Sequence, residues 1–209
     1  MRIVIFGASG LTGRELVTQA LALGHDVTAF SRHPHALARP DKRLRIEEGD
    51  ITDAVAVGRA VEGQGAVLSA LGAPTPMRPY PALQTGIDNV VRAMETSGVE
   101  RLVYLSFLGV RAGGDHLGFF VNHVAARLLR HAIVDHAANE RRIQMSRLAW
   151  TIVHAPKLTG GPRTAQYRSG EDIPVDAFIP TLSRADAADF MLRQLTDDGH
   201  IRRTLRVMY

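Results

Sequence analysis

The sequence predicts an α/β fold in which helices cover both faces of one doubly wound parallel sheet. Apolar stretches of four to six residues alternate with longer segments of helical spacing, which is the pattern of successive β-α units. The first unit opens the chain: residues 1–6 are apolar, residues 7–13 contain three glycines, and residues 14–23 are amphipathic. The 209 residues are enough for one such domain and too few for two of ordinary size. We therefore expect a single domain over residues 1–209.

The later elements follow from the same alternation. Strands are expected at 25–30, 44–48, 66–71, 101–106, 150–154 and 204–207, and helices at 53–61, 81–97, about 119–147 and 184–195. Gly24 and Gly98 are placed to end helices, and Ser183 to begin one. Long stretches rich in Gly and Pro follow three of the strands, at 72–81, 110–118 and 156–180. These loops are expected over the carboxyl edge of the sheet, where ligands bind, and the last belongs to a small C-terminal substrate-side region.

The glycine-rich turn is the first candidate site. Gly7, Gly10 and Gly13 stand at i, i+3 and i+6 between a strand-like and a helix-like segment. In that context the first glycine makes the turn, the second allows close approach of a diphosphate, and the third packs the helix on the sheet. We favour this interpretation over a plain glycine-rich turn. The expected contacts are Gly7, Ala8, Ser9, Gly10, Leu11, Thr12 and Gly13.

The residues at the end of the second expected strand indicate which of the two nicotinamide dinucleotides is bound. A ribose 2′-hydroxyl calls for a carboxylate there, and a 2′-phosphate calls for arginine. The chain has Ser31 and Arg32 and no acid at this point. Arginine offers a planar pair of donors and serine adds a hydroxyl. NADP(H) is therefore the preferred cofactor, with NAD(H) possible.

Two further segments are placed to contact the nucleotide. After the third strand, the carboxylate of Asp50 is placed for the adenine amino group and Ile51 for the ring. The alternative for Asp50 is a helix N-cap, a position that Asp53 can fill as well. After the fourth strand, Leu71 and Gly72 are expected to let the ribose or nicotinamide pass close to the backbone.

Composition narrows the function classes. The formal charge is +4, but the arginines are spread along the chain without interleaved aromatic residues, so no nucleic-acid partner is expected. There is no cysteine, which excludes disulfides and thiolate metal sites. The apolar run at residues 1–6 is too short for a signal segment or membrane span. We expect a cytoplasmic protein with no membrane partner.

A metal site is not expected from the histidines. His123, His131 and His136 fall on one expected helix. The last two are spaced i, i+5, and not the i, i+4 that places two ligands on one face. Asn89, on another helix, is expected to tie that helix to a neighbouring loop.

The segments described so far, Gly7–Gly13, Phe30–Arg32, Gly49–Asp50 and Ser69–Gly72, together resemble the atypical short-chain dehydrogenases/reductases. Within that group the chain is similar to the NAD(P)H-binding branch of NmrA-like and flavin reductase (biliverdin-IXβ reductase)-like proteins. Residues 86–91, 98–106, 150–156, 158–162 and 183–186 extend the match. The resemblance implies a Rossmann fold. It also implies that the ribose and nicotinamide are surrounded by Leu71, Gly72, Ser106, Pro156, Lys157 and Leu158.

One motif of typical short-chain dehydrogenases is missing. In Tyr-x-x-x-Lys, lysine lowers the tyrosine pKa for proton transfer to a carbonyl. None of Tyr80, Tyr104, Tyr167 and Tyr209 has lysine four residues later. A flavin, quinone or bilin stabilises the added charge in its own conjugated system and depends less on such a pair. We therefore expect an NAD(P)H-dependent reductase of a small conjugated acceptor.

Four residues are candidates for the reaction site. Ser106 can donate a hydrogen bond to substrate or nicotinamide, or be satisfied by backbone at the strand end. Lys157 can neutralise a reduced acceptor or a cofactor phosphate, or be a solvated loop lysine. His154 and Tyr167 are assigned to the substrate pocket, with a hydrogen-bonded strand-end histidine and a loop anchor as their alternatives.

A different class of function remains open. An NmrA-like redox sensor would bind the dinucleotide without turnover and act through a protein partner; an apolar patch at residues 113–120 would favour it. A pocket lined by Ser106, Lys157 and Tyr167 would favour the enzyme. An epimerase or isomerase is disfavoured by the missing Tyr-x-x-x-Lys pair. The protein is expected to be a monomer or homodimer.

Overall fold

The computed structural model describes residues 1–37, 41–73, 75, 78–110, 130–177 and 179–209. Within them, one sheet has the order β3-β2-β1-β4-β5-β6-β10-β8, and β7 pairs with β9 in a small second sheet. All neighbours are parallel except β8 and β10, which are antiparallel. The strands are β1 (Arg2–Phe6), β2 (Asp26–Ser31), β3 (Leu44–Glu48), β4 (Ala66–Ser69), β5 (Arg101–Phe107), β6 (Ala149–Ala155), β7 (Lys157–Thr159), β8 (Arg168–Gly170), β9 (Thr181–Ser183) and β10 (Arg203–Met208).

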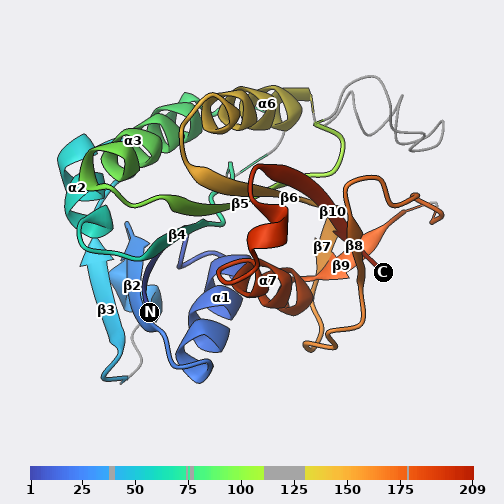
Figure 1. The fold of residues 1–209 in the computed structure, drawn as a ribbon, viewed down its shortest axis with the longest axis horizontal. Coiled ribbons are helices and arrows are strands. Elements are labelled where there is room, and N and C mark those ends of the chain that lie inside the picture. The colour runs from blue at the N-terminus through green and yellow to red at the C-terminus, as the bar shows by residue number, and fades with distance from the viewer. Residues whose placement is uncertain (38–40, 74, 76–77, 111–129, 178) are drawn as a thin grey trace.

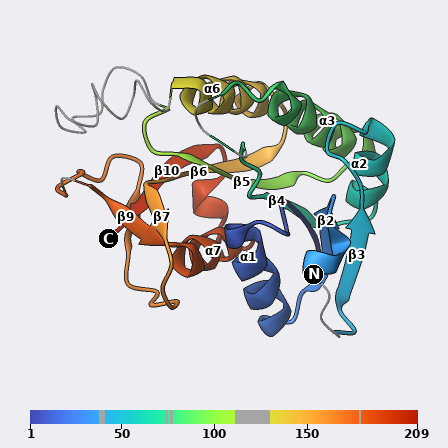
Figure 2. The same cartoon turned by 180° about the vertical axis from the view of Figure 1, so that it is seen from behind.

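Helices cover both faces of the large sheet (Figure 1). Helices α2 (Ala54–Val61), α3 (Pro81–Ser97) and α6 (Arg130–Gln144) lie side by side over one face. Helices α1 (Leu11–Ala22) and α7 (Arg184–Arg193) pack together on the other face, as the view from behind also shows (Figure 2). Two short 3₁₀ helices, η1 (Pro34–Leu37) and η3 (Asp198–His200), complete the described elements.

The topology confirms the fold class expected from the sequence. The order β3-β2-β1-β4-β5-β6 is the one in which two mononucleotide-binding halves meet between β1 and β4. Ligands of such sheets bind outside the carboxyl ends of the strands at that reversal. The glycine-rich turn follows β1 at this edge.

Burial explains why the strands are almost continuously apolar. Side chains of β1 alternate between two cores: Ile3 and Ile5 join the one under α1 and α7, while Val4 and Phe6 join the one under α2, α3 and α6. All four are completely buried. A strand covered on both faces has no polar side to present to water.

A buried arginine stabilises the amino edge of the sheet through hydrogen bonds. Arg101, at the start of β5, donates hydrogen bonds to the carbonyls of Gln194, Ala149 and Leu102 and to the Thr151 hydroxyl. The Gln194 carbonyl is at the C-cap of α7, where a cation is favoured by the helix dipole. Burial lowers the pKa of this guanidinium.

Several expected boundaries need correction. Helix α6 ends at Gln144 and not near Arg147, because the backbone N–H and the hydroxyl of Ser146 both bond to the Ile143 carbonyl and close the turn. Its expected start at residue 119 lies outside the described residues. The segment 156–180, expected as a loop, contains the short strands β7 and β8. Ser183 caps α7 and Gly98, with φ of 69°, ends α3, as expected.

Among the described helices, none is long and apolar enough to cross a membrane.

Candidate functional site

The glycine-rich turn has the geometry of an anion site. Helix α1 begins after Gly10, which has no side chain to cap it, so the amides of the first turn are free of a side-chain acceptor. The turn is closed by a hydrogen bond of 3.0 Å from the Gly10 N–H to the Gly7 carbonyl. Gly7 has a φ of 79°, which favours glycine. A Cβ on Gly13 would lie 2.0 Å from the Gly7 carbonyl oxygen, so this position admits no side chain.

A cavity extends from this turn across the carboxyl ends of β2 and β4. It is lined by residues from the turn, from the loops after β2, β3 and β4, and from the start of α3: Gly7, Ser9, Gly10, Phe30, Ser31, Arg32, Gly49, Ile51, Ala70, Leu71, Gly72, Tyr80 and Leu83. A Cβ on Gly72 would meet nothing within 4 Å, so the chain leaves open space there. The backbone cradle and the open path beside Gly72 fit an elongated ligand with a diphosphate at its centre.

The cationic end of the cavity is formed by Arg32. Its side chain is 52% exposed, and its Nη1 lies 3.5 Å from the Tyr80 hydroxyl and 3.9 Å from Oδ2 of Asp50. Ser31 is buried, and its Oγ accepts a hydrogen bond from the His33 N–H. The guanidinium is therefore available to an anion. The sequence did not indicate that the carboxylate of Asp50 would lie close to it.

The contacts of Asp50 exclude one of the two roles considered for it, that of the helix N-cap. Asp53 is the N-cap of α2, because its carboxylate accepts from the N–H groups of Val55 and Ala56. Asp50 is not that cap; its Oδ1 accepts from the N–H and hydroxyl of Thr52. These two hydrogen bonds lower the pKa of Asp50, with a smaller contribution from Arg32.

Ile51 is held between the cavity and helix α3. Its carbonyl accepts a hydrogen bond of 3.0 Å from the Asn89 side chain, which confirms the structural role expected for Asn89. A Cβ on Gly86 would lie 2.3 Å from Cγ1 of Ile51, so the helix passes directly against this side chain. Ile51 is thereby fixed as an apolar wall of the cavity.

Next along the edge, β5 and β6 end in a cluster of polar side chains under helix α6. Ser106 and His154 are register partners on neighbouring strands. Both contact the same atom, Oε1 of Glu140: the Ser106 hydroxyl donates to it, and Nε2 of His154 lies 2.9 Å away. Nδ1 of His154 is buried without a partner in the described part of the chain. Ser106 lies two residues beyond Tyr104, as Leu71 lies two residues beyond its register partner Ser69, so both follow the last paired residues of β4 and β5 at the same edge of the sheet.

Helix α6 supplies a second histidine to the cluster. Nδ1 of His136 lies 2.9 Å from the Tyr104 hydroxyl and 3.4 Å from the Ser106 hydroxyl. Tyr104 also accepts a hydrogen bond from Asn139. Burial lowers the pKa of His136, while the nearby Glu140 and Asp135 oppose that shift. Burial raises the pKa of Tyr104, so its hydroxyl stays protonated.

Asp135 joins this cluster to the cavity. The carboxylate is buried and accepts from the Tyr80 backbone N–H at 3.0 Å and from the Gln84 side chain at 2.8 Å. Tyr80 lines the cavity and reaches Arg32 with its hydroxyl. One residue therefore connects the cationic end of the cavity to helix α6.

Ser106, expected to donate a hydrogen bond to substrate or nicotinamide, has its only hydroxyl hydrogen engaged by Glu140. It is thus satisfied by a side chain and not by backbone, and donating to a ligand would require this bond to be exchanged. His154 is 1% exposed and held by Glu140, which is the strand-end alternative.

The loop after β6 holds three of the expected contacts. Pro156 is buried, Leu158 packs against the core under α1 and α7, and Lys157 is exposed. No hydrogen bond or ion pair joins the Lys157 side chain to another described residue. Of the turn residues, Ala8 is buried in that same core and Leu11 is exposed.

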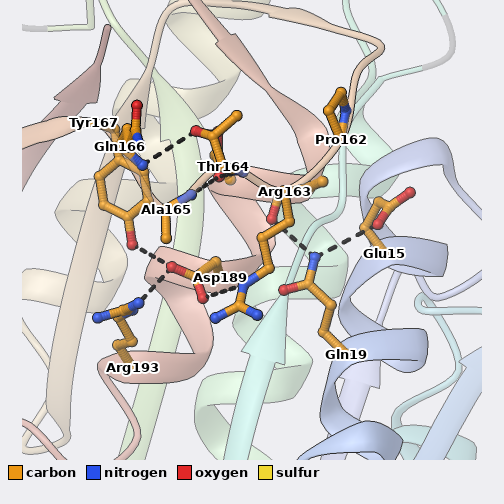
Figure 3. Close-up of polar contacts among 12 residues, drawn as sticks. Glu15, Gln19, Pro162, Arg163, Thr164, Ala165, Gln166, Tyr167, Asp189 and Arg193 are labelled. Carbon is orange, nitrogen blue, oxygen red and sulfur yellow. Dashed lines mark hydrogen bonds and ion pairs between the residues drawn. The ribbon is translucent and has the colours of Figure 1, made fainter.

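Tyr167 is a loop anchor. Figure 3 shows its hydroxyl directed at the carboxylate of Asp189, to which it donates at 2.6 Å. Asp189 also binds Arg163 and Arg193, and the Tyr167 ring packs edge-on against Phe190. This ring belongs to the core under α1 and α7, on the opposite face from the Ser106 cluster. The described residues therefore do not form a pocket shared by Ser106, Lys157 and Tyr167, the feature that would have favoured an enzyme over a sensor.

Sequence reasoning missed Tyr104, Asp135, Asn139 and Glu140, and considered His136 only as a metal ligand. Polar residues on a helix are ordinarily assigned to its solvent face. The one available signal was spacing, because residues 135, 136, 139 and 140 form an i, i+1, i+4, i+5 stripe. The apolar patch expected at 113–120, and His123, lie outside the described residues.

Known proteins with the same fold and motifs were found by sequence and by structure. The chain is 33% identical over 128 residues to a 3β-hydroxysteroid dehydrogenase/Δ5→4-isomerase of Mycobacterium tuberculosis, a match over 56% of this chain and 34% of that protein. The chain thus spans about a third of the length of that relative. The solved oxidoreductase ylbE from Lactococcus lactis superposes with a TM-score of 0.84 at 16% identity, over 99% of this chain and 90% of that one.

A second solved structure is ChuY, an anaerobillin reductase from Escherichia coli O157:H7. It superposes with a TM-score of 0.81 at 22% identity, over 99% of this chain and 96% of that one. The NAD(P)H-binding family matches residues 7–198, from the first glycine of the turn to η3. The chain therefore belongs to the NAD(P)H-binding family and carries a nicotinamide-dinucleotide site of the Rossmann type.

Proposed function

We propose that this protein is an NADPH-dependent reductase that transfers hydride directly to a small conjugated acceptor of the flavin, quinone or bilin class. The observation that carries the proposal is the cavity at the glycine-rich turn, which is lined by Leu71 and Gly72 after β4, together with the polar cluster of Ser106 and His136 on the neighbouring strand β5 and on α6. A bound dinucleotide supplies the hydride. The residues of the chain bind it, orient it and surround the acceptor.

Two residues support a preference for NADPH over NADH, and a third opposes it. Arg32 faces the cavity with half of its side chain exposed, and arginine suits a phosphate because it offers two parallel donors. Tyr80 adds a hydroxyl beside the guanidinium. Asp50, 3.9 Å from Arg32, opposes the preference by repelling a second anion, so we expect discrimination to be moderate.

The acceptor class is argued from the proton chemistry. Without a Tyr-x-x-x-Lys pair, reduction of an isolated carbonyl lacks its usual acid, which disfavours the hydroxysteroid chemistry named for the M. tuberculosis relative. A conjugated acceptor spreads the added charge over its own atoms. The name of ChuY, a reductase of a bilin-type compound, agrees with this class.

The test is NADPH oxidation with a panel of riboflavin, flavin mononucleotide, menadione and biliverdin, after micromolar NADPH binding has been established by calorimetry. We expect turnover with at least one acceptor and slower turnover with NADH. Tight NADPH binding without turnover of any acceptor would contradict the reductase and favour a dinucleotide sensor. Absence of binding would contradict the site itself.

A further inference from the structure

We propose that His136 is the catalytic acid of this reductase, and that Nε2 of its imidazolium delivers the proton that the acceptor needs after hydride addition. The inference rests on the proposed function and deepens it. It assigns to helix α6 the proton transfer that the missing Tyr-x-x-x-Lys pair would otherwise perform.

The first support is the one-sided attachment of the imidazole. Nδ1 faces two hydroxyl groups, Tyr104 at 2.9 Å and Ser106 at 3.4 Å, both on β5. Nε2 makes no hydrogen bond with any residue that the structure describes. His136 is only partly buried, whereas Tyr104 is completely buried. One nitrogen is held by the protein and the other is left for a ligand.

The second support is that the hydroxyl oxygens can hold a hydrogen on Nδ1 in both protonation states. The Ser106 hydrogen is donated to Glu140, so the Ser106 oxygen is free to accept from Nδ1, and the Tyr104 oxygen can accept from Nδ1 as well as from Asn139. With Nδ1–H bonded to these oxygens in the imidazolium and in the neutral ring, the exchangeable proton is the one on Nε2.

The third support is the charge around the ring. Burial, and to a smaller extent His154 on β6, lowers the pKa of His136, while Glu140 and Asp135 on the same helix favour the cation. Tyr104, on β5, stays neutral. Developing negative charge on a nearby acceptor adds to the two carboxylates and stabilises the imidazolium further.

The fourth support is location. Asp135, next to His136 in the chain, binds the backbone N–H of Tyr80, which lines the dinucleotide cavity. Ser106, which His136 contacts, ends the strand beside the Leu71–Gly72 segment. His136 is therefore linked to the cavity through Asp135 and Tyr80, and to the strand beside β4 through Ser106.

The step balances for a quinone. Hydride addition, with its two electrons, gives the hydroquinone monoanion. The Nε2–H bond of the imidazolium breaks, a new O–H bond forms on the quinone oxygen, and neutral imidazole remains. A proton from water then restores the cation.

The test compares two acceptors that differ in their need for a proton. Menadione takes a hydride and a proton, whereas N-methylacridinium takes a hydride at carbon and becomes neutral without one. In His136→Asn, the side-chain amide can still donate to the Tyr104 oxygen but no titratable group remains. We expect menadione turnover to fall about 100-fold, within the usual range for loss of a general acid, and acridinium turnover to stay within about twofold. His131→Gln, on the same helix, is the matched control and should change neither rate.

Other results would overturn the proposal. Unchanged menadione turnover would show that His136 is no acid, and an equal loss with both acceptors would show that it acts in binding or folding. If the wild-type protein reduces neither acceptor while binding NADPH, the proposed function fails for these acceptors.

A measurement independent of turnover then still tests the arrangement. Nitrogen NMR of histidine-labelled protein, assigned with His136→Asn, should show neutral His136 protonated at Nδ1, and Glu140→Gln should lower its pKa. A neutral ring protonated at Nε2, or a pKa that Glu140→Gln leaves unchanged, would overturn the assignment.

Discussion

Arg32 is the residue on which the choice of cofactor depends, and Arg32→Ala isolates its contribution. The substitution removes a guanidinium that is 52% exposed and whose described contacts are a 3.5 Å hydrogen bond to Tyr80 and a 3.9 Å ion pair with Asp50. Neither contact holds the fold together, and exposed pairs of this kind contribute little to stability. The free energy of unfolding should therefore stay within about 0.5 kcal/mol of that of the wild-type protein.

The effect on binding is larger and selective. A hydrogen bond to a charged group contributes about 1.5–3 kcal/mol, and each 1.4 kcal/mol is about tenfold in affinity. Because Arg32 is half exposed and the nearby Asp50 partly neutralises its charge, we take the lower part of that range. The Kd for NADPH should rise about 10- to 30-fold, and the Kd for NADH, which lacks the 2′-phosphate, should change less than about threefold.

Isothermal calorimetry with both nucleotides measures this difference directly. The selectivity of the wild-type protein should also shrink as salt rises, because exposed charges are screened over about 10 Å at 0.1 M ionic strength. Arg43→Ala is the matched control, since Arg43 precedes β3 at the opposite edge of the sheet and pairs only weakly with Asp41. An equal loss for NADPH and NADH, or none, would refute the assignment of Arg32 to the 2′-phosphate.

Three further sets of substitutions test the site and the fold. Gly13→Ala places a Cβ 2.0 Å from a backbone oxygen and should lower the free energy of unfolding by about 3 kcal/mol or more, measured by thermal unfolding. In Gly72→Ala the new Cβ meets nothing within 4 Å, so this variant should weaken NADPH binding while leaving the melting temperature unchanged. Asp50→Asn keeps an acceptor for Thr52 and removes the charge beside the guanidinium, so NADPH should bind up to about fivefold more tightly in calorimetry; weaker binding would contradict the repulsion. Burial opposes a lowered pKa for Asp186, but the hydrogen bonds to its carboxylate outweigh burial and lower that pKa. The carboxylate therefore contributes fully to the free energy of unfolding above its unfolded pKa of about 4, and this contribution is lost as the pH falls below that value. Asp186→Asn should therefore be less stable at pH 7 in urea and lose less stability between neutral pH and about pH 3; an unchanged acid dependence would exclude this role.

The sequence was sufficient for the architecture because its signals are local. The strand at residues 44–48 and the helix at 81–97 were predicted with the bounds that the structure has, since the first alternates apolar and polar residues, the second has apolar residues at helical spacing, and a glycine follows each. Asp53 and Ser183 were placed as caps because a cap acts on its own next residues. The glycine-rich turn was found for the same reason.

The reaction end of the site was harder to predict because it is assembled across long separations in the chain. Glu140 is charged and lies on a helix of low mean hydropathy, so nothing local indicates that it is buried against His154 and Ser106. Tyr167 was placed in the substrate pocket because its loop follows a strand at the carboxyl edge. The structure turns it to the opposite face, where Asp189 and Phe190 hold it.

The buried guanidinium of Arg101 has a consequence for what the chain tolerates. It serves four acceptors on two strands and a helix end, and does so with donors from all three of its nitrogens. A lysine has three hydrogens on a single atom and cannot span acceptors set so far apart. Arg101→Lys keeps the charge but would lose hydrogen bonds that join the end of α7 to the amino edge of the sheet. This edge is opposite to the one where the ligand site lies.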